Sequence, residues 1–367
     1  MLLWQIILLA VGMILLIKGA DFFVDGSSKI AKALKIPSLI IGLTLVSMGT
    51  SAPELSVSIN AALSGSNDLS LGNVVGSNAF NTFLILGVSS IVVPLVIGDD
   101  MKKYDIPIML GIYGLFLVFA FLITPYKLDR IESIIYLILF VSYMVLLFFR
   151  AKKGNSEEEI EEEPSSVKNI ILSILIGIAG VLTIIGFETI AVIVIAIFTV
   201  LLVIKFKKGS SAKSKVLNIL ISVFFTGAGL LAIIGGGTLV VDSASFIAKE
   251  LGMSETLVGL TIVAVGTSLP ELVTSVVASI KKENDIAIGN VIGSNIFNVL
   301  LILGVTSTIK PLNINSESLI DLVVLFVSGL LVFIISRLGK NMKKWQGLLF
   351  LLLYVAYLAY IITRNYI

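Results

Sequence analysis

The stretch GTSAPELSVSIN, residues 49–60, places Glu54 directly after Pro53 within a long apolar run. The pattern returns as GTSLPELVTSVV, residues 266–277, where Glu271 follows Pro270. A carboxylate inside an apolar segment is costly, and so is a proline inside a helix. Their joint repetition indicates a role that both copies share.

The two stretches belong to a longer internal repeat. A shift of 217 positions aligns residues 42–88 with residues 259–305 without a gap, and 27 of the 47 aligned positions are identical. The same shift pairs Asp25 with Asp242, so the duplicated unit extends upstream. The sequence therefore predicts two homologous halves.

Composition indicates an integral membrane protein. Hydrophobic residues form 57% of the 367-residue chain, charged residues only 14%, and the mean hydropathy is +1.07. A soluble domain carries about a quarter of its residues charged. Runs such as IIYLILFVSYMVLLFF are apolar throughout, whereas the strands of a membrane barrel alternate polar and apolar residues. We therefore expect an all-α polytopic protein.

The apolar runs predict two five-helix repeats, which together give ten core transmembrane helices. We expect helices at 3–28, 37–63, 71–94, 104–124 and 131–149, and again at 217–246, 256–280, 288–309, 318–336 and 346–363. The predicted organisation is a first repeat at 1–150, an acidic cytoplasmic linker at 151–168, an inserted apolar transmembrane hairpin at 169–208 and a second repeat at 209–367.

The distribution of basic residues predicts the orientation. With the N-terminus outside the cell membrane, twenty Lys and Arg residues fall on inside segments and five on outside segments. Five helices per half and an even insertion give the halves opposite orientations. Such inverted repeats are typical of secondary transporters, which bind their substrates near the midplane between the halves.

The absence of Cys and His from the chain restricts its chemistry. Thiolate and imidazole metal sites are excluded, and ions must be bound by oxygen. An intramembrane hydrolase would use Ser51 or Ser268 but lacks a histidine base, so we do not expect an enzyme. A cation channel with an acidic filter is a further alternative. Ion flux through a channel needs no counter-ion, whereas transport by an antiporter does.

Each glutamate motif predicts a site rich in oxygen ligands. Neither copy contains a Lys or Arg, which favours a cation site over a structural ion pair or a protonated carboxyl group. Pro53 and Pro270 cannot donate to the carbonyls one turn earlier, so main-chain oxygens are freed near the glutamates. Hydroxyl groups lie within one turn, on Thr50, Ser51, Thr267 and Ser268.

A second repeated motif, GNVVGSNAFN at 72–81 and GNVIGSNIFN at 289–298, adds neutral polar groups. Its asparagines lie three apart and share a helix face: Asn78 with Asn81, and Asn295 with Asn298, beside Ser77 and Ser294. These amides fit either cation binding or hydrogen bonding between helices. The motif's glycines predict close helix packing.

Two carboxylates among oxygen ligands suit Ca²⁺, or two Na⁺ ions. Competition of both ions for the same charges predicts an antiporter. Protons also compete for carboxylates, so a Ca²⁺/H⁺ exchanger is the alternative.

The two motifs in both halves resemble the alpha-repeats of the sodium/calcium exchanger family, within the calcium/cation antiporter superfamily. The resemblance covers about four-fifths of the chain. It implies ten core helices, an outward N-terminus and alternating access in which helices 1 and 6 slide past a fixed core. The inserted hairpin is not part of that pattern.

The resemblance also implies individual ion ligands. Ca²⁺ would be bound by Glu54 and Glu271 with the main-chain carbonyls of Thr50 and Thr267. One Na⁺ site would use Glu54, Ala264, Thr267, Ser268 and Ser294, and the other Glu271, Ser47, Thr50, Ser51 and Ser77. Asn81 and Asn298 would face the midpoint between the glutamates.

Relatives with Asp at the position of Asn298 include potassium-dependent exchangers, and the proton-coupled branch tends to carry a third glutamate where this chain reads GSN. Both differences favour Na⁺ alone as the counter-ion. We expect no cofactor and no nucleic-acid partner; the expected partners are Ca²⁺, Na⁺ and the lipid bilayer.

Overall fold

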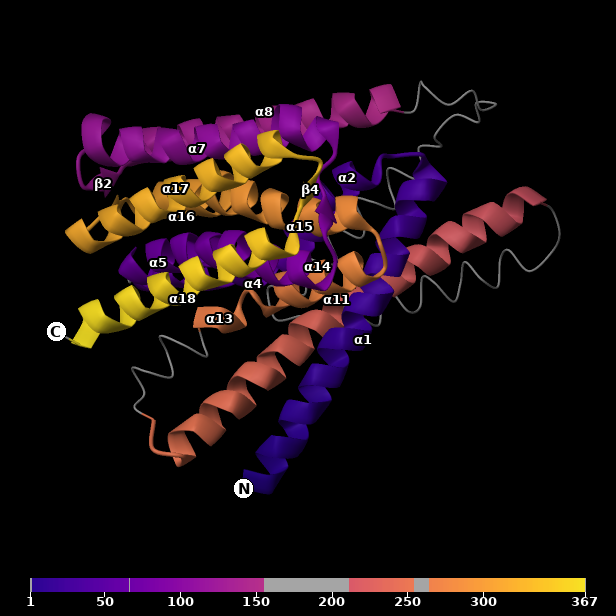
Figure 1. Cartoon of the computed structure of the whole chain (residues 1–367), viewed down its shortest axis with the longest axis horizontal. Coiled ribbons are helices and arrows are strands. Elements are labelled where there is room, and N and C mark those ends of the chain that lie inside the picture. The colour runs from indigo at the N-terminus through magenta and orange to yellow at the C-terminus, as the bar shows by residue number, and fades with distance from the viewer. Residues whose placement is uncertain (1, 66, 155–210, 254–263, 367) are drawn as a thin grey trace.

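The computed structural model describes residues 2–65, 67–154, 211–253 and 264–366. The predicted hairpin at 169–208 lies outside these ranges, as do most of the acidic linker and the first part of the predicted helix 256–280. The described part of the chain is built from helices and four strands of two residues each (Figure 1). The expected all-helical class is therefore confirmed.

The first half contains twelve helical segments and two of the strands. In chain order they are α1 (Leu2–Leu34), α2 (Ser38–Ile41), η1 (Gly42–Val46), α3 (Ser47–Thr50), α4 (Ala52–Ser64), α5 (Asn67–Ala79), η2 (Phe80–Ile85), α6 (Leu86–Val92), β1 (Leu95–Val96), η3 (Met101–Asp105), α7 (Ile106–Val118), η4 (Phe119–Ile123), β2 (Lys127–Leu128) and α8 (Arg130–Gly154). The segments labelled η are π-helical turns that directly adjoin α-helices.

The described part of the second half repeats this order. It contains α11 (Ser211–Glu250), α13 (Ala264–Gly266), α14 (Leu269–Ile280), α15 (Asn284–Phe297), η6 (Asn298–Leu303), α16 (Gly304–Ile309), β3 (Leu312–Asn313), α17 (Ser316–Leu338), β4 (Asn341–Met342) and α18 (Lys344–Tyr366). Strand β1 pairs with β4, and β2 with β3, both antiparallel. Each pair joins a connector of one half to a connector of the other.

Eight described helices are long and apolar enough to cross a membrane, and a ninth span results if the bent pair Ser38–Thr50 and Ala52–Ser64 counts as one. The chain is therefore a multi-pass membrane protein. Burial separates inner from outer spans: 94% of an 18-residue apolar window within Asn284–Ile309 is buried, against 22% of such a window within Lys344–Arg364. The motif-bearing helices thus form the centre, and apolar side chains of the outer helices face lipid.

Several helices extend beyond their predicted ends. Helix α1 continues to Leu34 instead of ending near residue 28, and α11 begins at Ser211 and ends at Glu250, not at 217 and 246. Hydropathy marks only the part of a helix that lies in the bilayer. Lys and Ala are good helix formers, so segments such as Lys29–Leu34 continue the helix into water.

Both glutamate motifs interrupt their helices. The predicted helix 37–63 is bent by 47° between Thr50 and Ala52, where Ser51 has φ −84° and ψ 6°. Ser268 adopts nearly the same conformation, φ −93° and ψ 5°, before α14. Pro53 and Pro270 lie in the first turn after each break. Proline is favoured there because its missing N–H has no partner in the first turn of a helix.

Helices α1 and α11 form a closely packed pair that runs obliquely past the other helices (Figure 1). A Cβ atom built on Gly12 would lie 2.9 Å from the carbonyl oxygen of Gly236, and one on Gly19 would lie 2.8 Å from that of Gly229. Glycine thus permits the two backbones to touch. The shift of 217 maps Gly12 onto Gly229 and Gly19 onto Gly236, so both contacts use equivalent positions.

One end of α1 is bound to the loop between α14 and α15. Lys281 Nζ donates to Asp25 Oδ1 at 2.7 Å and to the main-chain oxygen of Asp21 at 3.0 Å, while Ser28 Oγ donates to Glu283 Oε1 at 2.6 Å. Partial burial lowers the pKa of Lys281, but the contacts with Asp25 and Asp21 outweigh it and the pKa is raised. The ammonium group therefore stays charged at neutral pH.

We predict that Gly236→Ala separates α1 from α11 while Gly235→Ala does not. The added methyl group at 236 would meet the Gly12 oxygen and the Leu16 nitrogen at 2.8 Å, and overpacking of this kind costs about 1–3 kcal/mol. Among described residues nothing lies within 4 Å of a Cβ atom at Gly235, where alanine gains about 1 kcal/mol in helix propensity. Thermal unfolding in detergent measures both; equal midpoints would contradict the close contact.

Candidate cation-binding site

The two helix breaks bring Glu54 and Glu271 into the centre of the molecule. Each glutamate lies in the first turn of its helix, α4 or α14, and the two are 1% and 0% exposed. No salt bridge joins either of them to a Lys or Arg of the described ranges. A structural ion pair within this part of the chain therefore does not account for the two carboxylates.

Each carboxylate accepts a hydrogen bond from the break of the opposite half. Ser268 Oγ donates to Glu54 Oε1 at 3.1 Å, and Ser51 Oγ donates to Glu271 Oε1 at 2.9 Å. Ser77 Oγ lies 3.1 Å from Ser268 Oγ and extends this chain of hydroxyl groups to α5. The sequence-predicted serines and glutamates of both halves thus form one polar cluster.

Four buried side-chain oxygens of the cluster have no protein partner in the described structure: Glu54 Oε2, Glu271 Oε2, Asn81 Oδ1 and Asn298 Oδ1. Helix α4 packs on η6, which begins with Asn298, and α14 packs on η2, which carries Asn81. A buried polar atom without a partner costs about 1–3 kcal/mol. These four acceptor oxygens fit the ligand preference of a hard cation.

The asparagines of the second motif divide into two kinds. Asn78 and Asn295 use both ends of their amides: Asn298 Nδ2 donates to Asn78 Oδ1 at 2.9 Å, and Asn81 Nδ2 donates to Asn295 Oδ1 at 3.2 Å. Their own amide nitrogens donate to the Asn295 main-chain oxygen and to Thr82. Asn78 and Asn295 therefore join the helices, whereas Asn81 and Asn298 keep a free acceptor oxygen.

The helix ends also favour a cation at this place. Thr50 is the last residue of α3, and Thr267 directly follows α13. Carbonyl oxygens at the C-terminal end of a helix lack intrahelical donors and carry partial negative charge. Thr50 is fully buried and Thr267 partly buried. Their carbonyl groups belong to the same breaks as Ser51 and Ser268.

The remaining candidates lie around the cluster. Ser47 and Ser294 are fully buried, and Ser294 Oγ donates to the main-chain oxygen of Ser47 at 3.5 Å. Ala264 begins α13, and its side chain lies outside what the structure describes.

Glycines hold α15 against the broken helix of the first half. A Cβ atom built on Gly289 would lie 2.9 Å from Gly42 Cα, and one on Gly293 would lie 2.7 Å from Ser47 Oγ. The packing role predicted for these two glycines is confirmed. For Gly72 and Gly76, no described atom lies within 4 Å of the added Cβ, and the segment 254–263, which includes the equivalent of Gly42, is outside the described ranges.

Two asparagines that sequence reasoning did not select also contact the site. Asn73 Nδ2 donates to the main-chain oxygen of Glu54 at 3.2 Å, and Asn290 Nδ2 to that of Glu271 at 3.3 Å. Both residues are the second letter of the repeated GN pair. Because the same residue occurs at this position in both copies, the sequence repeat could have identified Asn73 and Asn290 as candidates.

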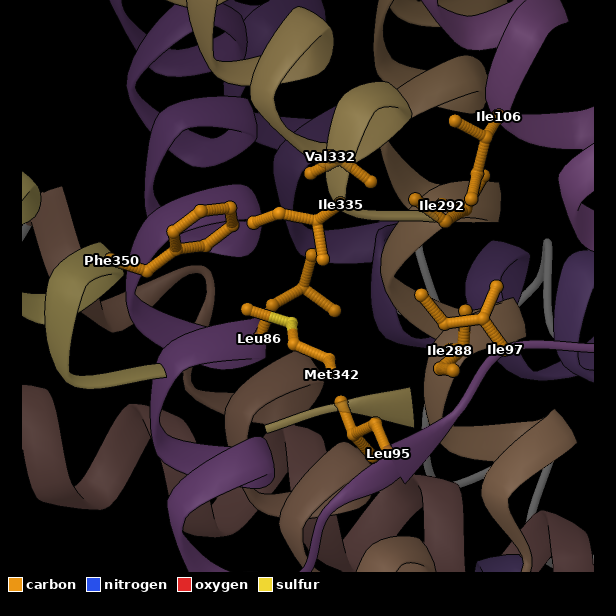
Figure 2. Close-up of a pocket in the computed structure, with 10 residues that line it drawn as sticks. All are labelled: Leu86, Leu95, Ile97, Ile106, Ile288, Ile292, Val332, Ile335, Met342 and Phe350. Atoms are coloured by element: carbon orange, nitrogen blue, oxygen red, sulfur yellow. The ribbon is translucent and has the colours of Figure 1, made fainter. Parts of the chain in front are cut away.

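A separate small cavity between β1, β4 and the ends of α15 and α17 has a different character (Figure 2). Carbon and sulfur atoms form its wall, from Leu86, Leu95, Ile97, Ile106, Ile288, Ile292, Val332, Ile335, Met342 and Phe350. It offers no ligand for an ion, so we place the cation site at the glutamates.

The fold and the polar cluster define a class: a helical membrane protein with an oxygen-lined candidate cation site among its most buried helices. Carboxylate, amide, hydroxyl and carbonyl oxygens are ligands for hard cations such as Ca²⁺ and Na⁺. No group of three acidic residues that could hold a metal ion occurs within the described ranges. The site therefore combines two charges with neutral oxygens.

Comparison with known proteins gives the family. The model of the sodium/calcium exchanger protein family matches residues 4–149 and 221–363. The chain is 34% identical to the sodium/calcium exchanger MaX1 of Methanosarcina acetivorans over 96% of this chain and 97% of that protein. It is 31% identical to the inner membrane protein YrbG of Escherichia coli over 83% and 79% of the two chains.

Solved structures agree with this assignment. A structure of the sodium-calcium exchanger NCX_Mj, soaked with 10 mM Na⁺ and no Ca²⁺, matches with a TM-score of 0.74 and 30% identity, over 98% of this chain and 99% of that chain. The chain belongs to the sodium/calcium exchanger family. Its class is that of a cation/Ca²⁺ antiporter, a transporter rather than a catalytic enzyme.

We predict that Glu54→Gln and Glu271→Gln each weaken Ca²⁺ binding by about two orders of magnitude or more. Removing one charge of a buried ionic interaction costs about 3–5 kcal/mol, and a single carboxylate cannot balance a divalent cation. Glu132→Gln is the matched control, because Glu132 is also buried but accepts from the main-chain nitrogen of Asp129, away from the site. Isothermal titration of the purified variants measures the effect, and near-normal affinity in either site variant would refute this assignment.

Proposed function

We propose that this protein exchanges Na⁺ for Ca²⁺ across the cell membrane by alternating access. The observation that carries this proposal is the pair of buried carboxylates, each with an unpartnered oxygen, at the two equivalent helix breaks. Two carboxylates are balanced by one Ca²⁺ or by two Na⁺ ions. The two ions therefore compete for one charge, and entry of one requires release of the other.

The ligand roles follow the two breaks. Glu54 and Glu271, with the carbonyl oxygens of Thr50 and Thr267, bind Ca²⁺, and Asn81 and Asn298 face the midpoint between the carboxylates. One flanking Na⁺ site uses Glu54, Ala264, Thr267, Ser268 and Ser294, and the other Glu271, Ser47, Thr50, Ser51 and Ser77. Support comes from the serine–glutamate bonds between the halves and from the free amide oxygens.

The proposed architecture is a pair of inverted five-helix repeats, residues 1–150 and 209–367, with ten core helices and the N-terminus outside. The cytoplasmic linker and the transmembrane hairpin between them complete the arrangement. Reciprocal contacts support the repeat symmetry. Ser51 bonds Glu271 as Ser268 bonds Glu54, and β1 pairs with β4 as β2 pairs with β3.

Coupling in this scheme comes from the cost of buried charge. Without bound cations, the protein would have to change its access state with two uncompensated carboxylates in surroundings that solvate charge poorly. Loading with Ca²⁺ or Na⁺ removes that cost. Only the loaded protein then changes its access state, so the movements of the two ions are linked.

The counter-ion is tested by separate gradients. In vesicles loaded with Na⁺, we predict that reconstituted protein takes up ⁴⁵Ca²⁺ when external Na⁺ is removed, because departing Na⁺ frees the carboxylates. Uptake driven by a pH gradient without any Na⁺ would instead establish Ca²⁺/H⁺ exchange. Ca²⁺ flux that needs no counter-ion at all would indicate a channel. Vesicles containing Glu271→Gln protein are the control for leakage.

Acid is expected to inhibit exchange by competition. Protons bind the same carboxylate oxygens as the cations, so lowering the pH on the Ca²⁺ side raises the half-saturating Ca²⁺ concentration. Excess Ca²⁺ restores the maximal rate, because the two cations exclude each other at one site. A lower maximal rate that excess Ca²⁺ does not restore would contradict direct competition. Initial rates at several pH values and Ca²⁺ concentrations distinguish these outcomes.

A further inference from the structure

Asn73 and Asn290 each connect the glutamate of their own half to the threonine of the opposite break. Thr50 Oγ1 shares its proton between Asn290 Oδ1 at 3.0 Å and the main-chain oxygen of Val46 at 3.1 Å, and Thr267 Oγ1 donates to Asn73 Oδ1 at 3.4 Å. The amide nitrogen of Asn290 donates to the main-chain oxygen of Glu271 at 3.3 Å. Asn73 makes the same bond to Glu54.

A third bond completes each amide. Asn290 Nδ2 donates to Ser275 Oγ at 2.9 Å, and Asn73 Nδ2 donates to Ser58 Oγ at the same distance. The NH₂ group of each asparagine thus donates only to residues of its own half, whereas its oxygen accepts from a residue of the other half. Asn290 is completely buried.

The contacts fix the orientation of the amides. A main-chain oxygen is only an acceptor, so the NH₂ group of Asn290 has to face Glu271, and the amide oxygen then has to face the hydroxyl group of Thr50. Turning the amide by 180° would place two acceptors against each other at the glutamate. The direction of the bond between the halves therefore follows from the chemistry of the groups.

We propose that Asn73 and Asn290 are positioning residues, which hold each glutamate at a fixed distance from the threonine of the opposite half. This proposal rests on the proposed function, in which Glu54, Glu271 and the two threonine carbonyls bind Ca²⁺. We assign neither asparagine a ligand role, because each amide oxygen has a hydroxyl partner, unlike those of Asn81 and Asn298. The name "amide clamp" is used below for each asparagine with its threonine and glutamate.

The breaks explain why such a clamp is needed. At Ser51 and Ser268 the main chain leaves helical geometry, so the segment that ends in Thr50 or Thr267 is not in line with the helix that carries the glutamate. Ca²⁺ requires six to eight oxygens at about 2.3–2.6 Å, so a ligand displaced by about 1 Å no longer contacts the ion. A bond from each threonine to the opposite glutamate segment limits that displacement.

The two amide clamps are unequal. The Thr50–Asn290 bond is shorter than the Thr267–Asn73 bond, and Thr50 is fully buried while Thr267 is only partly buried. Hydrogen bonds strengthen as water is excluded. We therefore expect loss of Asn290 to weaken Ca²⁺ binding more than loss of Asn73.

The test compares Asn290→Leu, Thr50→Val and Ser275→Ala. Asn290→Leu removes the whole clamp at similar volume, and Thr50→Val removes the hydroxyl group but retains the carbonyl ligand. Ser275→Ala is the matched control, because it removes a bond of the same amide that stays within one half. The readouts are the half-saturating Ca²⁺ concentration for the purified protein without Na⁺, and the thermal unfolding midpoint without Ca²⁺.

We expect Thr50→Val to raise the half-saturating Ca²⁺ concentration about three- to tenfold, the range for one buried hydrogen bond. Asn290→Leu also removes the bonds to Glu271 and Ser275, so it should raise that concentration at least as much. Ser275→Ala should change it less than twofold, even if it lowers the unfolding midpoint. The double variant Asn290→Leu/Thr50→Val should bind Ca²⁺ no more weakly than Asn290→Leu alone, because the Thr50–Asn290 bond is already lost in that single variant.

A purely structural role gives a different result. If all three variants lower the unfolding midpoint alike while the half-saturating Ca²⁺ concentration stays within twofold of wild type, the amide clamp is overturned and the proposed function stands. If wild-type protein neither binds nor exchanges Ca²⁺, the proposed function is overturned, and the clamp with it.

Discussion

Two buried carboxyl groups without a positive partner among the described residues set the main constraint on this protein. Glu54 and Glu271 are buried, and the hydrogen bonds from Ser51 and Ser268 satisfy only one oxygen of each carboxylate. A charge in a medium of low dielectric constant is stable only when an opposite charge or hydrogen bonds compensate it. The helix breaks and the free amide oxygens are arranged around this requirement, and a cation meets it.

Much of this arrangement could be predicted from the sequence. Apolar runs located the spans, and the repeated Pro–Glu pair located the breaks, because proline acts on its own helix through local chemistry. The ends of the long helices were harder. Hydropathy reports where a helix meets lipid and not where it stops, so the polar ends of α1 and α11 were missed.

The contacts between the halves mark the limit of sequence reasoning. Asn73 and Asn290 resemble any other amide in the motif, and only the fold shows that their oxygens meet Thr267 and Thr50. Likewise, the sequence could not decide whether Asn78 and Asn81 bind a cation or hydrogen-bond neighbouring helices. Which amide keeps a free oxygen depends on partners more than two hundred positions away.

The ion pairs of Lys281 attach α1 to the loop after α14, and the sequence does not repeat this lysine in the first half. The shift of 217 maps Lys281 onto Ser64, so the equivalent loop of the first half has no ammonium group at that position. Any sliding of α1 along the remaining helices has to separate Lys281 from Asp21 and Asp25 at one end only. In the proposed exchange cycle, the free energy of this attachment would therefore add to one of the two access states and not to the other.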